Sequence, residues 1–158
     1  MIGERDGRFA ILAETPPIGT PNRWLNPAGI ADFDGDGAVE IALVRMPHAL
    51  GRLELWRWSA GKLLKVAETR DTSNHAIGSR ALGQSAVADF DGDGVVDLAI
   101  PSFDRRAIRL LSFRGGVREI ARIKLPAPVT TNFIAFASRG LPEILFGTAD
   151  GMLFMLHR

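Results

Sequence analysis

A six-residue stretch, Asp-Phe-Asp-Gly-Asp-Gly, occurs twice in this chain of 158 residues and constrains the fold more than any other feature. The first copy starts at Asp32 and the second at Asp89, 57 residues further on. Each copy leads into an apolar run rich in Val, Ile and Leu, which predicts a buried strand. A repeat of this period is typical of propeller blades and solenoids.

Each copy places carboxylates at loop positions 1, 3, 5 and 9. Four anionic side chains this close repel one another unless a cation neutralises them. Calcium suits such a loop, because it takes six to eight oxygen ligands from carboxylates, backbone carbonyls and water. The glycine at position 6 permits a tight, partly left-handed backbone that points alternate side chains inward. The carbonyl at position 7 is the natural backbone ligand.

Two other kinds of loop share part of this pattern. An EF-hand begins with the same spacing but needs a bidentate Glu at position 12 and a flanking helix. Position 12 is Leu43 in one copy and Ile100 in the other, inside the apolar run, which excludes an EF-hand. A polar Asp-Gly hairpin turn without metal stays open as the alternative, although two copies of identical spacing favour the metal.

The pattern Asp-x-Asp-x-Asp-Gly-x-x-Asp/Glu before an apolar strand resembles the FG-GAP/VCBS repeat of integrin-type β-propellers. The resemblance implies that each loop joins two strands of a blade and holds calcium. It implies two sites, with backbone carbonyls at position 7: Asp32, Asp34, Asp36, Ala38 and Glu40, and Asp89, Asp91, Asp93, Val95 and Asp97. It also implies an extracellular or periplasmic location, although the N-terminal residues show no signal peptide.

Strand-like stretches recur around the two loops. The segment from Gly7 to Thr15 returns 54 residues later, from Gly61 to Thr69. Four strands per repeat and no amphipathic helix predict an all-β fold of about three four-stranded antiparallel propeller blades. A β-sandwich is the structural alternative. The expected division of the single domain is a strand completing another blade in residues 1–15, a first blade in 16–69, a second in 70–124 and a degenerate third in 125–158.

The third repeat has lost the acidic loop. Ala135, Ala137 and Arg139 take loop positions 1, 3 and 5, so we expect two calcium ions per chain. Arg139 is expected to replace the cation by pairing with Glu143. Because three blades are too few for an ordinary closed ring, we expect a partial propeller that is half of a homodimeric ring or a segment of a larger propeller.

Two long connections join the outer strand of one blade to the first strand of the next. The first, residues 15–27, is rich in proline, which disfavours a strand before Ala28. Both connections should emerge on one face, where loops on a rigid scaffold commonly bind ligands. The candidate recognition residues are Asn22, Arg23, Trp24, Asn74, His75 and Arg80. The alternative is a pair of solvated loops held by their own hydrogen bonds, with His48 a further surface residue.

Composition and motifs narrow the function. A net charge of +1 with scattered arginines gives no reason to expect a nucleic-acid or membrane partner. The absence of cysteine leaves the redox compartment open. The sequence has no nucleophile elbow, His-rich metal cluster or phosphate-binding loop, so we do not expect an enzyme. We predict a calcium-binding propeller scaffold that recognises a protein or glycan; the alternatives are a module of a polysaccharide lyase or hydrolase, or a purely structural fragment of a larger propeller.

Overall fold

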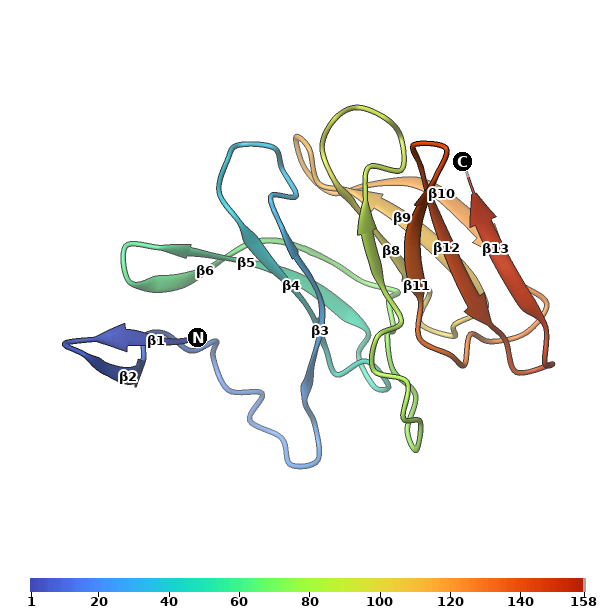
Figure 1. The fold of residues 1–158 in the computed structure, drawn as a ribbon. Helices are drawn as coiled ribbons and strands as arrows, with labels where there is room; N and C mark the ends of the chain where they lie inside the picture. Colours follow the sequence, from blue (N-terminus) through green and yellow to red (C-terminus); the bar gives the residue numbers. More distant parts are fainter. Residues whose placement is uncertain (158) are drawn as a thin grey trace.

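A computed structural model describes residues 1–157, which form thirteen strands and no helix. A small hairpin precedes three antiparallel sheets that follow one another along the chain (Figure 1). No sheet formed by these residues closes on itself. The all-β fold and the blade-like sheets of a partial propeller are therefore confirmed. Among the described residues there is no helix of the length and apolarity that a membrane span requires.

The sheets are built from neighbouring strands in chain order. The hairpin contains β1 (Ile2–Arg5) and β2 (Arg8–Ile11). The first sheet contains β3 (Leu25–Ala31), β4 (Glu40–Arg45), β5 (Arg52–Ser59) and β6 (Lys62–Thr69). The second contains β7 (Ala86–Ala88), β8 (Asp97–Pro101), β9 (Ala107–Ser112) and β10 (Arg118–Lys124). The third has three strands, β11 (Ile134–Ser138), β12 (Leu141–Gly147) and β13 (Leu153–His157).

The two central strands of the second sheet, β8 and β9, are buried on both faces, which explains why most of their successive residues are apolar. Side chains alternate across a strand, so Leu98 and Ile100 pack toward the first sheet. Ala99, between them, packs toward the third sheet. Two cores result, one on each side of the second sheet, and both extend to the ends of the sheets where the Asp loops begin.

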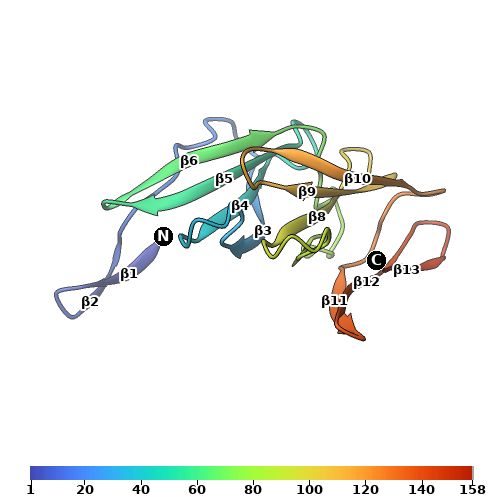
Figure 2. The same cartoon turned by 90° about the horizontal axis from the view of Figure 1, so that it is seen from above.

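The N-terminal segment and β3 differ from expectation. Residues 1–15 do not form one strand, because β2 pairs with β1 across a turn at Asp6 and Gly7. This hairpin projects beside the first sheet (Figure 2). Strand β3 starts at Leu25 and includes Pro27, whereas the sequence predicts a start at Ala28, after the proline. Because β3 is an edge strand with a register shift between Pro27 and Gly29, the missing N–H disturbs little of the ladder.

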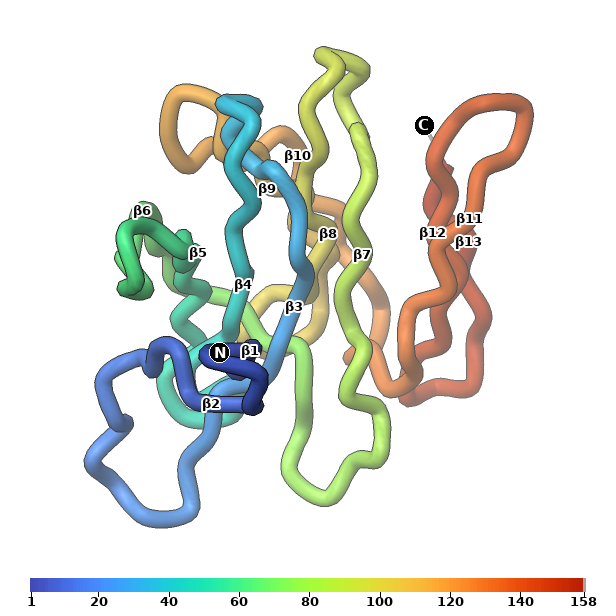
Figure 3. Tube along the Cα trace, turned by 60° about the vertical axis from the view of Figure 1, so that its left-hand side comes forward, coloured from blue at the N-terminus to red at the C-terminus, as the bar shows by residue number. Residues whose placement is uncertain are grey.

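The connections divide between two ends of the molecule. The hairpin loops after β3, β7 and β11 lie together at one end of the sheets (Figures 1 and 3). The long connections, residues 12–24 and 70–85, lie together at the opposite end. The two Asp loops are thus separated from the candidate recognition residues by the length of the strands.

Candidate metal centre

The two Asp loops, residues 32–40 and 89–97, share their internal hydrogen bonds. Asp32 accepts hydrogen bonds from the backbone N–H groups three, four and five residues further on, at 2.8, 3.1 and 2.9 Å. Asp89 accepts the equivalent three at 2.6, 3.2 and 2.9 Å. At position 6, Gly37 and Gly94 have φ of 90° and 86°, in the left-handed region that glycine adopts without strain. The predicted tight loop is therefore formed twice.

The phenylalanine at position 2 fixes each loop to the core. The backbone N–H of Phe33 donates to Glu40 Oε2 at 2.9 Å, and that of Phe90 donates to Asp97 Oδ2 at 2.9 Å. The ring of Phe33 is fully buried in the core between the first and second sheets. The ring of Phe90 is buried in the core between the second and third. In each loop, one oxygen of the carboxylate at position 9 therefore accepts a hydrogen bond from the backbone.

Carboxylate oxygens converge in both loops. In the first, Asp32, Asp34 and Asp36 each offer an oxygen within 4.8 Å of the others. In the second, the oxygens of Asp89, Asp91 and Asp97 lie equally close. Clustered carboxylates of this kind are the ligands that calcium prefers.

Position 5 of each loop is locked by position 7. The N–H groups of Ala38 and Val95 donate to Asp36 Oδ1 and Asp93 Oδ1, both at 2.9 Å. These bonds are the main reason why the pKa of each of the two carboxyls lies below its usual range. The carbonyls of Ala38 and Val95 stay predicted ligands.

An arginine from β5 enters the first loop. Arg57 lies opposite Glu40 in the pairing of β4 with β5. Its Nε donates to Glu40 Oε1 at 2.7 Å, and its Nη2 also lies 2.5 Å from that oxygen. Nη2 reaches Asp34 Oδ2 at 2.6 Å, and Nη1 reaches Asp36 Oδ2 at 2.7 Å. Together these carboxylates raise the pKa of the Arg57 guanidinium, Glu40 most of all. One guanidinium thus contacts three of the four carboxylates of the loop and contributes one positive charge among them.

The second loop has a serine in the equivalent place. Leu98 pairs with Leu111 as Ile41 pairs with Trp56, so Ser112 takes the position of Arg57. Asp97 is fully buried, and burial is the main cause that raises its pKa. The hydrogen bond from the Phe90 N–H to Oδ2 and, after it, the nearby Ser112 hydroxyl lower the pKa of Asp97 and so oppose this rise. Within residues 1–157, neither Asp97 Oδ1 nor Ser112 Oγ has a hydrogen-bond partner.

Two exposed arginines contact the second loop from outside. Arg114 Nη1 lies 3.3 Å from Asp93 Oδ2, and Arg118 Nη2 lies 3.0 Å from Asp91 Oδ2. Both arginine side chains are more than half exposed, at 56% and 55%. Neither ion pair involves Asp97. The two loops therefore have the same backbone and different counter-charges.

The third repeat has a short turn instead of an acidic loop. Ala135 and Ala137 lie within β11, and Ser138 pairs with Leu141 across a two-residue turn. The turn residues have φ of 51° and 80°, as in a type I′ hairpin. The predicted ion pair between Arg139 and Glu143 is wrong, since none joins them in the described part of the chain. Arg139 occupies the turn, while Glu143 lies in the middle of β12.

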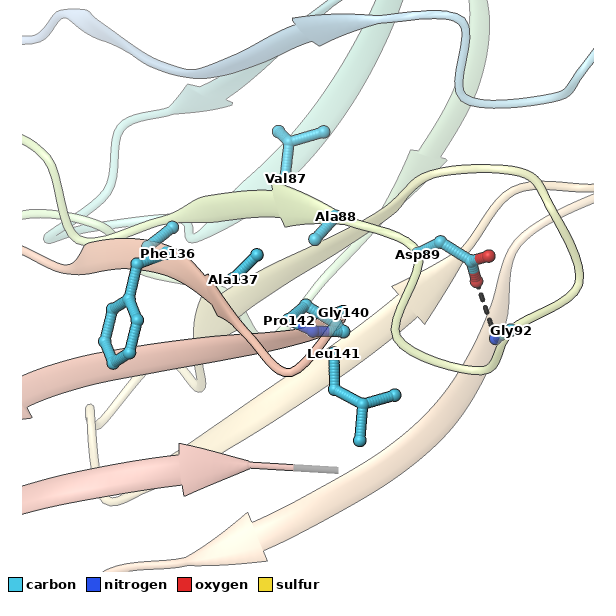
Figure 4. A pocket seen from close by; sticks show the side chains of 10 residues that line it. Val87, Ala88, Asp89, Gly92, Phe136, Ala137, Gly140, Leu141 and Pro142 are labelled. Carbon is cyan, nitrogen blue, oxygen red and sulfur yellow. Dashed lines mark hydrogen bonds between the residues drawn. The ribbon is translucent and has the colours of Figure 1, made fainter.

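The second loop also borders a groove of about 510 Å³ between the second and third sheets. Figure 4 shows Asp89 and Gly92 on one side of this groove and Gly140, Leu141 and Pro142 on the other. The first loop instead packs against the second. Gly35 lies so close to the side chain of Val95 that a Cβ added to the glycine would come within 2.7 Å of it. Of the two loops, the second is thus the one that lines an open groove.

The candidate recognition residues are only partly brought together. The rings of Trp24 and His75 lie 5.4 Å apart between centroids, and His48 joins them 4.4 Å from Trp24. Trp24 is 37% exposed, and Asn22, Arg23 and Arg80 are also exposed. Burial, with smaller contributions from Arg23 and His75, lowers the pKa of His48.

Asn74 is fully buried and ties the second connection to β3. Its Nδ2 donates to Pro27 O at 2.9 Å, while Asn26 Nδ2 donates to Asn74 O at 3.3 Å. Asn74 therefore shapes the connection from inside and does not face solvent.

Sequence reasoning missed Arg57, Ser112 and the approach of His48 to Trp24. The first two had a usable signal. Arg57 follows the stretch Leu53–Trp56, and aligning that stretch with its counterpart in the second repeat gives Ser112 as the residue equivalent to Arg57. No sequence pattern joins His48 to Trp24, because their contact depends on how two loops pack.

Comparison with known families identifies one segment. The model of the FG-GAP-like repeat matches residues 32–100, which contain both Asp loops and extend into β8. This match confirms the resemblance to FG-GAP repeats and a β-propeller-like scaffold. Among curated proteins, none matches the chain.

Proposed function

Because residues 32–100 carry FG-GAP-like repeats, we propose that this chain is a calcium-binding propeller scaffold that recognises a protein or glycan. The observation that carries the proposal is the convergence of three carboxylate oxygens in each Asp loop, within 4.8 Å of one another. The buried and unpartnered Oδ1 of Asp97 adds a donor atom for which a cation is the natural partner. This donor set of oxygens alone suits calcium better than zinc or copper.

The proposed role of calcium is structural. Bound at the carboxylates of the loops, it would supply positive charge at the point where β3 meets β4 and where β7 meets β8. The loop glycines and the buried Phe33 and Phe90 position the ligands before the ion arrives. An ion that binds only this folded arrangement stabilises it by mass action.

The proposed recognition face lies at the end opposite the Asp loops. Its centre is Trp24, whose exposed indole offers apolar contact area and a hydrogen-bond donor. The indole is supported by the rings of His48 and of His75, which is buried. Asn22 and Arg23 add exposed polar groups beside it. Since the ions would be bound at the far end of the strands, we propose that they stabilise this face without touching the ligand.

We propose that the chain completes its propeller with another blade, from a second copy or from the rest of a larger propeller. The third sheet supports this, because several of its large apolar side chains are exposed. Those exposed by 42% or more are Ile134, Phe136, Leu141, Leu153 and Met155. An extracellular or periplasmic location completes the proposal, since weak calcium sites of extracellular modules are filled at the calcium concentrations found there.

The first test is thermal unfolding with calcium and with a chelator. Calcium at about 100 times its dissociation constant should stabilise the folded chain by ~2.7 kcal/mol. For a chain of this length we expect a rise in Tm of roughly 5–10 °C. The double variant Asp91→Asn/Asp93→Asn should lose most of the second loop's share of the rise, while Asp150→Asn, in a turn after β12, should retain it. A Tm that ignores both calcium and chelator would contradict the proposal.

A further inference from the structure

We propose that Arg57 is a built-in counter-ion that occupies the first Asp loop in place of calcium, so that calcium binds tightly only at the second loop. The inference rests on the proposed calcium function and makes the two sites unequal. From sequence alone, both loops have the same motif and an equal claim to an ion. The difference comes from one residue of β5, outside the motif.

The guanidinium of Arg57 is well placed to replace a cation. It makes four contacts of 2.5–2.7 Å with the carboxylates of Asp34, Asp36 and Glu40. Glu40 is completely buried, and only 20% of the Arg57 side chain is exposed. Planar, charge-assisted contacts of this kind are among the strongest hydrogen bonds in proteins. Because the β4–β5 register already places Arg57 opposite Glu40, little further ordering is required.

The second loop has no such internal cation. Ser112 occupies the place of Arg57, and Asp97 Oδ1 is buried with no hydrogen-bond partner in residues 1–157. The converging oxygens of the second loop include Asp97, whereas those of the first do not include Glu40. Arg114 and Arg118 pair with Asp93 and Asp91 from the solvent side and make no ion pair with Asp97. A buried carboxylate in this state favours binding of a small cation.

Competition between Arg57 and calcium weakens the first site. A ligand that needs a minor conformation binds more weakly by the fraction of molecules that adopt it. If Arg57 leaves the loop in about 1% of molecules, the apparent calcium affinity there falls about 100-fold. The second loop is also accessible to an ion from solvent, because Asp89 lines an open groove of about 510 Å³.

The experiment is calcium titration by isothermal calorimetry of the folded full chain. The wild type should bind one ion tightly. Arg57→Gln and Arg57→Ser, the latter copying the second repeat, should bind two, with the new site at least about tenfold tighter than the first loop of the wild type. Asp89→Asn/Asp91→Asn should bind none at the concentration that saturates the wild type. Adding Arg57→Gln to that double variant should restore one ion.

A matched control tests whether any buried arginine has this effect. Arg45 of the first sheet pairs with buried Glu54 at 3.0 Å, with 12% of its side chain exposed, and contacts neither loop. Arg45→Gln should therefore leave the number of tight ions at one.

The outcomes separate this inference from the proposed function. Two tight ions in the wild type would overturn the role of Arg57 and leave calcium binding intact. No ion in the wild type or in either Arg57 variant would overturn calcium binding itself. If the Arg57 variants do not fold without calcium, the double variant Asp89→Asn/Asp91→Asn still decides. One tight ion retained there would show that the first loop binds calcium in the presence of Arg57.

Discussion

The first and second sheets are two versions of one unit, and they differ most in the charges carried by their third strands. Strand β5 carries Glu54 and Arg57, and the matching places in β9 hold Arg109 and Ser112. In the first sheet, Glu54 pairs with Arg45 of β4. In the second, Arg109 pairs instead with Glu119 of β10 and donates to two carbonyls of the connection that follows β6. The backbone repeats while the ion pairs do not.

This comparison shows that an acidic loop does not determine its own counter-charge. Both loops fold in the same way, because their hydrogen bonds run from backbone N–H groups to their own carboxylates. The guanidinium that contacts the first loop comes from a neighbouring strand, 17 residues after Glu40, and the second loop has a serine at that place. On the proposal that Arg57 takes the place of calcium, the motif of the loop alone would overstate the number of ions that this chain binds.

The largest expected effect tests whether the two loops are fixed to the core equally. Phe33→Ala should lower the free energy of unfolding by ~3–5 kcal/mol, because the ring is fully buried and packs edge-on to Phe113. Phe90→Ala should cost roughly 1 kcal/mol less, since Phe90 borders an apolar cavity of about 230 Å³. Urea denaturation measures both, with the 88% exposed Phe9→Ala as the control. Equal losses would show that the two anchors are packed alike.

A smaller effect on the free energy of unfolding should distinguish the two carboxylates at loop position 9, Glu40 and Asp97, when it is measured in the presence of a chelator. Glu40→Gln should destabilise the chain by ~1–3 kcal/mol, because Arg57 loses its buried partner. Asp97→Asn should change stability by less than about 1 kcal/mol, in the stabilising direction, since it removes a buried charge without a counter-ion. Calcium should then stabilise the Glu40→Gln variant and have no effect on Asp97→Asn. Equal destabilisation by both substitutions would mean that the loops have the same electrostatics.

Much of the fold could be predicted from the sequence, because local patterns dictate it. The position of β4 follows from the apolar run after the first loop, and the turn between β5 and β6 follows from Ala60 and Gly61. The N-terminal hairpin and the early start of β3 could not be predicted in this way. They depend on pairing with β1 and on a register shift at Pro27, and neither has a local signal.

The site was predictable as a set of residues but not as an electrostatic arrangement. The spacing of aspartates shows which oxygens converge, since loop geometry is a short-range property. The contact with Arg57 depends on the strand register that brings this residue opposite Glu40, and the loop motif itself carries no information on that register. The same limit explains Arg139, which was expected to act as a cation but lies in a tight turn.

The smallest effect concerns acid, and it tests the ion pair found only in the second sheet. Hydrogen bonds from Arg122, then Arg109, lower the pKa of Glu119 from 4.5 to about 2. A carboxyl with a lowered folded pKa contributes stability that is fully present above pH 4.5 and is lost as the pH falls toward 2. Because 30% of the Glu119 side chain is exposed, water screens the pair, and we expect a contribution of ~1–2 kcal/mol.

Glu119→Gln should therefore be less stable than the wild type at pH 7 by ~1–2 kcal/mol. This gap in the free energy of unfolding should close as the pH falls from 4.5 to 2. Urea midpoints measured at a series of pH values give the gap directly, in chelator so that calcium plays no part. The matched variant in the first sheet is Glu68→Gln, whose carboxylate pairs with Lys65 in an exposed position on β6. Its gap should be close to zero at every pH, because an exposed pair contributes little. A constant gap for Glu119→Gln would instead mean that the residue stabilises β10 by packing and not by its charge.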